Sequence, residues 1–142
     1  MDIKIIGHNS NEFAQMIRLR ITQLLEPIGV PASYIDEKKE KDDFLIAAFE
    51  KDEMIGCCVL TPKDDRAVQL RQMAVRSHYR GKGIGAAIID FAEKIARENN
   101  FLLVTMHARD PVIDFYKKCG YQIFDDPLFE VGIGHHKMRK QL

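Results

Sequence analysis

The stretch SHYRGKGIGAAIIDFAEKIAREN, residues 77–99, places a glycine-rich segment directly before an amphipathic helix pattern. Gly81, Gly83 and Gly85 alternate with a lysine and an isoleucine, and apolar residues then recur at helical spacing. Glycine in a helix costs about 1 kcal/mol relative to alanine. The chain therefore uses glycine here for a purpose that needs bare backbone, or backbone angles that other residues avoid.

A helix that begins at this segment forms an anion-binding site. The first turn of a helix exposes unpaired N–H groups and carries about half a positive charge. Glycines let successive N–H groups turn toward one anion, and Arg80 and Lys82 add positive charge beside them. The segment therefore predicts a diphosphate site, with a glycine-rich turn that binds no ligand as the alternative.

Two common nucleotide-binding motifs do not explain the segment. The pattern G-x-x-x-x-G-K-S/T is absent. Gly81, Gly83 and Ala86 fit G-x-G-x-x-A, the dinucleotide fingerprint, but that fold also needs an acidic residue about 20 positions later. The corresponding region reads FLLVTMHAR, residues 101–109, and has no carboxylate. The strands expected around it are also antiparallel, which disfavours a parallel dinucleotide-binding fold.

The segment resembles the acetyl-coenzyme A motif of the GNAT family of N-acetyltransferases, Q/R-x-x-G-x-G/A. Arg80, Gly83 and Gly85 occupy its defined positions. Segments similar to the family lie on both sides: LRQMAV at residues 70–75, VIDFYKKCGY at 112–121 and FEVGIGHHKMRKQL at 129–142. Together the resemblance spans about residues 44–142, and it is more specific than the short motif alone.

The residues predict a mixed domain with mostly antiparallel strands early and a strand–loop–helix–strand unit in the middle. The resemblance implies the α/β fold of the GNAT family, in which helices flank a mixed, mostly antiparallel central sheet. Apolar runs at 44–50, 53–61 and 67–75, joined by tight turns, predict an antiparallel meander. The resemblance implies that the strands at 66–75 and 101–106 are parallel and splayed apart. The chain is expected to form a single domain, residues 1–142.

Other segments complete the expected outline. A helix is expected at residues 9–27, capped by Asn9, and the apolar run at 101–106 is expected to be buried on both faces. Residues 121–124 and 129–138 are interpreted as two further strands. The charged run DEKKEKDD at 36–43 is expected to be a solvated loop.

The resemblance also implies where acetyl-coenzyme A (acetyl-CoA), the co-substrate, would bind. The strand before the glycine segment would hold its pantetheine arm through the backbone of Met73, Ala74 and Val75. Backbone N–H groups of the loop would hold the pyrophosphate, and these belong to Arg80, Gly81, Lys82, Gly83, Ile84, Gly85 and Ala86. The residues by themselves predict an anion at the same helix start.

The resemblance implies that Tyr116 protonates the departing thiolate. A phenol with a pKa of about 10 is protonated at neutral pH and can donate. The alternative is that Tyr116 only packs on its short helix. A base must also deprotonate the attacking amine, and the strand at 67–75 has no carboxylate for this. His107 is the predicted base, with His135 and His136 as alternatives, because histidine titrates near neutral pH. For each of the three, a structural or surface role is the alternative.

Arginines are candidates to bind the acceptor substrate. Arg109 takes a position where the family often has a polar residue near the acceptor cleft, and Arg71 lies on the strand that precedes the glycine segment. Arg18 and Arg20 are further candidates to bind an anionic substrate group. For each of them, a surface or structural role is the alternative.

The predicted activity is transfer of the acetyl group of acetyl-CoA to a primary amine of a small molecule or a protein, by direct attack in a ternary complex. A backbone N–H on the strand at 66–75 is expected to stabilise the oxyanion. Two alternatives stay open: a non-catalytic acetyl-CoA-binding sensor or scaffold, and a nucleotide- or RNA-binding domain.

The bulk composition narrows the partners further. With 21 basic and 21 acidic residues, the 142-residue chain has no net charge, which disfavours nucleic acid as a partner. No apolar run approaches the about 18–20 residues of a membrane span, and the three cysteines lack disulfide or metal spacing. We therefore expect a cytoplasmic protein with no metal and no membrane contact. A homodimer is an open prediction from the family resemblance.

Overall fold

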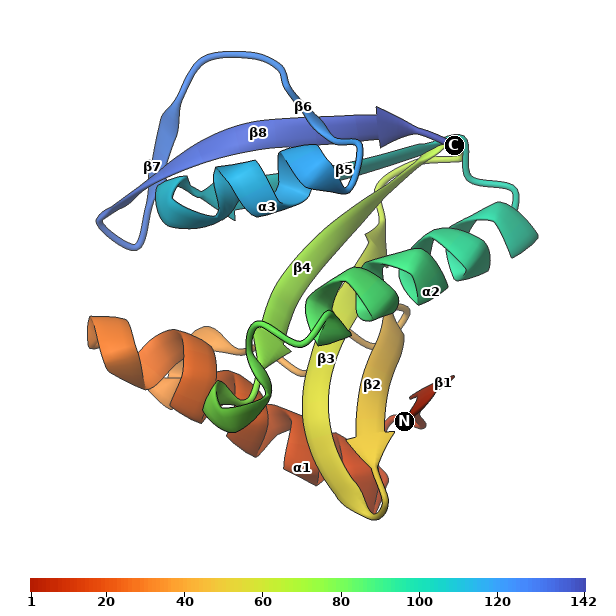
Figure 1. Cartoon of the computed structure of the whole chain (residues 1–142), viewed down its shortest axis with the longest axis vertical. Coiled ribbons are helices and arrows are strands. Elements are labelled where there is room, and N and C mark those ends of the chain that lie inside the picture. The colour runs from red at the N-terminus through yellow and green to blue at the C-terminus, as the bar shows by residue number, and fades with distance from the viewer.

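One mixed sheet forms the centre of the computed structural model, which describes all residues from 1 to 142 (Figure 1). Its strands are β1 (Asp2–Ile5), β2 (Phe44–Glu50), β3 (Glu53–Pro62), β4 (Ala67–Val75), β5 (Leu103–Arg109), β6 (Gln122–Ile123), β7 (Leu128–Glu130) and β8 (Ile133–Gln141). The strand order is β1-β2-β3-β4-β5-β8-β6, with β7 paired to β8. Every pairing is antiparallel except that of β4 with β5. The expected mixed, mostly antiparallel sheet is confirmed.

Helices cover both faces of this sheet. They are α1 (Asn11–Arg20), α2 (Ile84–Glu98), α3 (Ile113–Lys118), the π-helical η1 (Ile21–Leu25) and the 3-10 segments η2 (Glu26–Ile28), η3 (Ala32–Tyr34), η4 (Ser77–Tyr79) and η5 (Asp110–Val112). Residues of α2 and α3 share one core with Cys58 of β3, whereas residues of α1 share a second core with Cys57. Adjacent residues of β3 thus enter opposite cores, which explains its continuous apolar run. None of the helices has the length and apolar composition needed to cross a membrane.

β4 and β5 separate soon after they pair. Their parallel register runs only from Ala67–Leu103 to Gln69–Thr105. Beyond these pairs the two strands continue without bonding to each other, and Figure 1 shows them diverging. The expected splayed parallel pair is therefore confirmed, and it leaves a gap between the C-terminal halves of both strands.

β4 also carries a bulge near its middle. Cys57 of β3 pairs with Ala74, but Val59 pairs with Arg71, so β4 has one extra residue between these pairs. Within this extra length Gln72 has a φ of 55°, in the left-handed region. A bulge interrupts the ladder and leaves the extra residue unpaired.

Two expected boundaries are wrong. Ser10, rather than Asn9, caps α1: its Oγ accepts a hydrogen bond of 3.0 Å from the N–H of Phe13, whereas Asn9 lies in a left-handed turn with a φ of 61°. The strand expected at 129–138 is divided into β7 and β8. Val131 and Gly132 have φ of 47° and 76°, and this turn reverses the chain between β7 and β8.

β5 is buried on one face rather than on both. Val104, Met106 and Ala108 belong to the core that includes residues of α3, and the residues between them are only half-buried. In the C-terminal half of the strand, His107 and Arg109 on the second face line a cavity beside the gap that the splay creates.

The charged run at 36–43 is also not a fully solvated loop. Glu40 and Asp43 are buried, with 2% and 6% of their surface exposed. Arg20 pairs with Glu40, and Thr61 donates a hydrogen bond of 2.9 Å to Asp43, so both carboxylates have partners inside the fold.

Candidate active site

A cavity of about 810 Å³ opens between the diverging halves of β4 and β5. This volume is typical of a small-molecule site. Its lining includes residues of β4, β5, α3, η1, the loop before α2 and the segment from β7 to β8. All the predicted cofactor-binding residues except Lys82 line it: Met73, Ala74, Val75, Arg80, Gly81, Gly83, Ile84, Gly85 and Ala86.

The three glycines of the loop serve two different needs. Gly81 and Gly83 have φ of 76° and 81°, which other residues rarely adopt, and a side chain there would meet open space. Gly85 has no such φ, but a Cβ on it would lie 3.1 Å from Cζ of Phe115. Two glycines thus shape an open loop at the start of α2, and the third lets α3 pack closely against it.

The loop fits an anionic diphosphate. Gly83 is the N-cap of α2, so the first N–H groups of this helix point out from the loop into the cavity region. Arg80 is anchored beside them: its Nε donates to the Val75 carbonyl at 3.1 Å and its guanidinium donates to Gln23 Oε1 at 3.0 Å. Lys82 lies outside the lining, with its Nζ 5.5 Å from the centre of the Tyr79 ring. The arrangement supplies backbone donors and positive charge without a carboxylate in the first turn of the helix.

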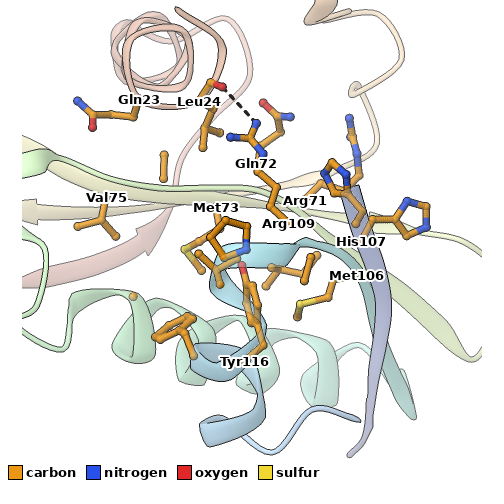
Figure 2. A pocket seen from close by; sticks show the side chains of 18 of the residues that line it. Gln23, Leu24, Arg71, Gln72, Met73, Val75, Met106, His107, Arg109 and Tyr116 are labelled. Atoms are coloured by element: carbon orange, nitrogen blue, oxygen red, sulfur yellow. Dashed lines mark hydrogen bonds between the residues drawn. The ribbon is translucent and has the colours of Figure 1, made fainter. Parts of the chain in front are cut away.

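Tyr116 reaches the cavity from α3. Its side chain is nearly buried, and its hydroxyl has no hydrogen-bond partner within the protein. Figure 2 shows the ring rising from α3 toward the side of β4 that bears Met73. Burial raises the pKa of the Tyr116 hydroxyl above its usual value, the thiols of Cys58 and Cys119 act in the same direction, and Arg109 partly offsets them. The hydroxyl therefore stays protonated at neutral pH, as a proton donor must.

His107 lies on the opposite wall and is paired with a carboxylate that the sequence analysis missed. Its Nδ1 contacts Oε1 of Glu130 on β7, and both side chains line the cavity. When the carboxylate accepts from Nδ1–H, the other ring nitrogen of a neutral imidazole is free to accept a proton. Glu130 is absent from the predicted site because 129–138 reads as one strand. Gly132 directly after Glu-Val is the sequence signal for the turn that brings β7 into the site.

His135 and His136 point to opposite sides, as their positions on one strand predict. His135 is buried and lines the cavity, and its Nδ1 lies 2.8 Å from the Ile133 carbonyl. His136 is outside the lining and pairs through Nδ1 with Asp110 at 2.7 Å. No group of three or more histidine, cysteine, aspartate or glutamate side chains is arranged to hold a metal ion.

The predicted arginines differ in how far they are already engaged. Arg71 lies 3.8 Å from Glu40 and 3.7 Å from Asp43, so two carboxylates offset its charge. Arg109 has no acidic partner: its guanidinium donates to the Leu24 carbonyl at 3.1 Å and so crosses from β5 to η1 (Figure 2). Arg20 is 1% exposed and bound to Glu40, which makes the hypothesis of a substrate-binding Arg20 wrong.

The splayed strands and the glycine loop at a helix start define a class, the acetyl-CoA-dependent acyltransferases. A model of the acetyltransferase (GNAT) family matches residues 13–121, and the chain belongs to this family. It is similar to the uncharacterized N-acetyltransferase YjcF of Bacillus subtilis (strain 168), with 24% identity over 137 residues, 96% of this chain and 97% of that protein. It is also 32% identical over 82 residues to probable N-acetyltransferase 14 of Xenopus tropicalis. That match covers 55% of this chain and 40% of the longer Xenopus protein.

Solved structures confirm the GNAT fold. A putative N-acetyltransferase from Lactobacillus plantarum matches with a TM-score of 0.87 and 28% identity, over 100% of this chain and 99% of that one. A GNAT family acetyltransferase from Elizabethkingia anophelis with acetyl-CoA bound matches with a TM-score of 0.77 and 19% identity, over 99% and 97% of the two chains.

Proposed function

We propose that the protein transfers the acetyl group of acetyl-CoA to a primary amine of a small molecule or a protein, by direct attack within a ternary complex. One observation carries this proposal: a single cavity is lined by the glycine loop, the Tyr116 hydroxyl and the His107–Glu130 pair. These are a diphosphate-binding element, a proton donor and a proton acceptor, the three parts that such a transfer needs.

The first proposed roles concern how the cavity would hold acetyl-CoA. Backbone groups of Met73, Ala74 and Val75 on β4 would bind the pantetheine arm, and the N–H groups from Arg80 to Ala86 would bind the pyrophosphate. Acetyl-CoA supplies an activated acyl carbon and a thiolate leaving group when it is bound. The acyl carbon would then lie between Tyr116 and His107, near the bulge of β4.

The proton transfers can be assigned to this chain's own residues. His107 takes a proton from the acceptor amine, and Glu130 stabilises the imidazolium that forms. Backbone N–H groups at the β4 bulge stabilise the negative charge that develops on the acyl oxygen. After the C–N bond has formed, the C–S bond breaks and Tyr116 gives its proton to the departing sulfur, so that an amide and a free thiol result. The proton on His107 then returns to Tyr116 through solvent.

The cysteines support direct attack rather than transfer through an acyl-enzyme. Cys57, Cys58 and Cys119 all lie outside the cavity lining. Burial raises the pKa of Cys57 to about 12 and that of Cys58 well above its ordinary value, so neither provides a thiolate near neutral pH. As free thiols they also support a reducing compartment, and we propose the cytoplasm. A single domain over 1–142 and a homodimer are kept as proposals.

Thermal unfolding with acetyl-CoA tests the proposed function first. At about 100 times the dissociation constant, binding should stabilise the fold by about 2.7 kcal/mol, which is about 5–10 °C for a domain of this size. Gly83→Glu should abolish the shift because its carboxylate repels the pyrophosphate. Gly29→Glu is the matched control: Gly29 also has a left-handed φ, of 72°, and open space around it, but it lies outside the cavity. A well-folded parent that shows no shift would overturn the proposal.

Release of the thiol from acetyl-CoA then separates an enzyme from a sensor. The parent is incubated with a panel of polyamines, lysine-containing peptides and amino sugars, and the free thiol is measured. Amine-dependent release, lost in Tyr116→Phe while the thermal shift is retained, supports the transferase. Binding without release for any amine favours the non-catalytic module.

A further inference from the structure

Gln72 stands in an unusual conformation within the wall of the cavity. It lies at the β4 bulge, lines the cavity and has a φ of 55°, which is uncommon for a residue other than glycine. Such a conformation persists only where surrounding contacts fix it. The contacts of Gln72 therefore say what determines the shape of the bulge.

Two buried donors hold Gln72 from two different elements. Nε of Arg20 on α1 donates to its side-chain Oε1 at 3.1 Å. The thiol of Cys57 on β3 donates to its backbone carbonyl with a sulfur–oxygen distance of 3.8 Å. Because burial raises the pKa of Cys57, the thiol keeps the proton that this contact requires. Side chain and backbone of Gln72 are thus fixed independently.

Arg20 is itself locked by a bidentate ion pair. Its two terminal nitrogens donate to the two oxygens of Glu40 at 2.9 and 2.6 Å, and both side chains are almost fully buried. A buried ion pair is weak evidence for stability, because desolvation opposes the attraction. The pair does fix the orientation of the Arg20 guanidinium: because both terminal nitrogens are bound to Glu40, Nε points at Gln72.

We propose that Arg20, locked by Glu40, is a positioning residue that holds Gln72 in the left-handed conformation and thereby aims the backbone N–H groups of the β4 bulge at the acyl oxygen. The inference rests on the proposed function, because it assigns the oxyanion donors of that reaction to this bulge. Neither Arg20 nor Glu40 lines the cavity, so Arg20 acts through Gln72; Glu40 acts through Arg20 and also lies 3.8 Å from Arg71, which does line the cavity.

The proposal predicts a selective loss of catalysis. A misdirected oxyanion donor lowers kcat about 10²–10³-fold. The glycine loop and Val75 lie outside the bulge, whereas Met73 and Ala74 belong to it or border it, so kcat should fall by far more than the affinity for acetyl-CoA, which separates transition-state from ground-state effects.

The test uses neutral replacements of similar shape. Removing either charge alone leaves the other without its bidentate partner in the core, so Arg20→Met is combined with Glu40→Gln. Gln72→Met removes only the acceptor of the Arg20 bond and leaves the contacts of Glu40 with Arg20 and Arg71 in place, so it tests the route through Gln72 by itself. Glu93→Gln is the matched control. Glu93 is equally buried and binds Tyr121 and Lys140 far along α2, outside the cavity lining, so this variant should lose stability and keep kcat.

A glycine rescue distinguishes positioning from general support of the fold. Glycine adopts a positive φ without help. Adding Gln72→Gly to the Arg20→Met/Glu40→Gln variant should therefore restore part of kcat, although neither the bond donor at position 20 nor the acceptor at position 72 is then present. If the network only stabilises the fold, the added glycine should lower stability further and restore no activity.

Two readouts decide the result. The first is kcat and KM for acetyl-CoA with the best amine of the panel; the second is the amide NMR shifts of residues 72–74 in the ligand-free protein. We expect moved shifts and a lowered kcat in both Met-containing variants, with a much smaller change in KM. Unchanged shifts, or moved shifts with full kcat, overturn the positioning role while leaving the transferase intact. A parent that binds acetyl-CoA but acetylates no amine overturns the proposed function, and the catalytic part of this inference with it.

Discussion

The adjacent buried thiols Cys57 and Cys58 make the fold sensitive to alkaline pH. Burial raises the pKa of Cys57 from 9.0 to about 12 and that of Cys58 well above 9.0, because a thiolate in the apolar core is not solvated. In the unfolded chain both thiols are in water and ionise around pH 9.0. Between that pH and the folded-state pKa the unfolded chain binds fewer protons, so the free energy of unfolding falls as pH rises.

The size of the effect follows from the unfolded pKa. For each thiol the loss is RT ln(1 + 10^(pH − 9.0)), which is about 0.06 kcal/mol at pH 8 and about 1.4 kcal/mol at pH 10. The two thiols together should therefore remove about 2.7 kcal/mol of stability between pH 8 and pH 10. Cys58→Ala removes one of these contributions and adds a loss from the cavity that does not depend on pH.

Urea unfolding at pH 8, 9 and 10 in the presence of a phosphine reductant measures this directly. Between pH 8 and pH 10, Cys58→Ala should lose about 1.4 kcal/mol less than the parent. Cys119→Ala is the control. The pKa of Cys119 is also raised by burial, but its side chain is partly exposed, so the change in pH dependence should be smaller. Equal losses in the parent and Cys58→Ala would show that the thiol ionises freely in the folded state and would refute the reasoning.

Three further predictions concern the cavity. Gly81→Ala should lower stability or acetyl-CoA affinity by about 1–2 kcal/mol in total, because alanine is strained at the left-handed φ of this position. Gly85→Leu should lower the melting temperature, because its side chain would collide with Phe115 and push α3 away from α2. Calorimetry and titration with acetyl-CoA separate the two effects, and an unchanged melting temperature of Gly85→Leu would contradict the close packing. Tyr116→Phe should lower kcat about 10²–10⁴-fold with little change in acetyl-CoA affinity, and a fully active variant would remove Tyr116 from the mechanism. His107→Ala should lower kcat by a similar factor, about 10²–10⁴-fold. Glu130→Gln should lower kcat less, because the amide keeps the contact with His107 but not the charge. If thiol-release kinetics show the larger loss for Glu130→Gln, the base is Glu130.

The glycine loop and the antiparallel meander of β2, β3 and β4 are predictable because their signals are local. Helix start, glycines and flanking cations fall within one short stretch, and apolar runs with tight turns define the meander. The splay of β4 from β5 comes only from the family resemblance, since no property of either strand indicates where pairing stops.

The parts of the site that the sequence analysis missed depend on contacts between distant segments. Glu40 lies in a run whose charge predicts solvation, and its burial is offset by Arg20, 20 residues earlier in the chain, and by Arg71 on β4. A signal did exist: Arg20 falls on the same helical stripe as Phe13, Met16 and Leu24, where a charged side chain needs a buried partner. The bulge at Gln72 has no such signal, because its φ is imposed by neighbours on α1 and β3.

The short pairing of β4 with β5 makes the width of the cavity sensitive to small rotations of β4 where the two strands meet. The last paired residue of β4 is Gln69, and the strand continues six residues to Val75, about 20 Å at the usual rise of a strand. A rotation of about 5° at the paired end would move the far end by about 1.7 Å over that length. Misplacement of about 1 Å at a reacting centre can cost about 10²-fold in rate. Because β4 stays paired with β3 as far as Val75, both strands would share such a rotation, and side chains packed where β4 meets β5, such as Val68 and Val104, are placed to influence the width of a cavity that they do not line.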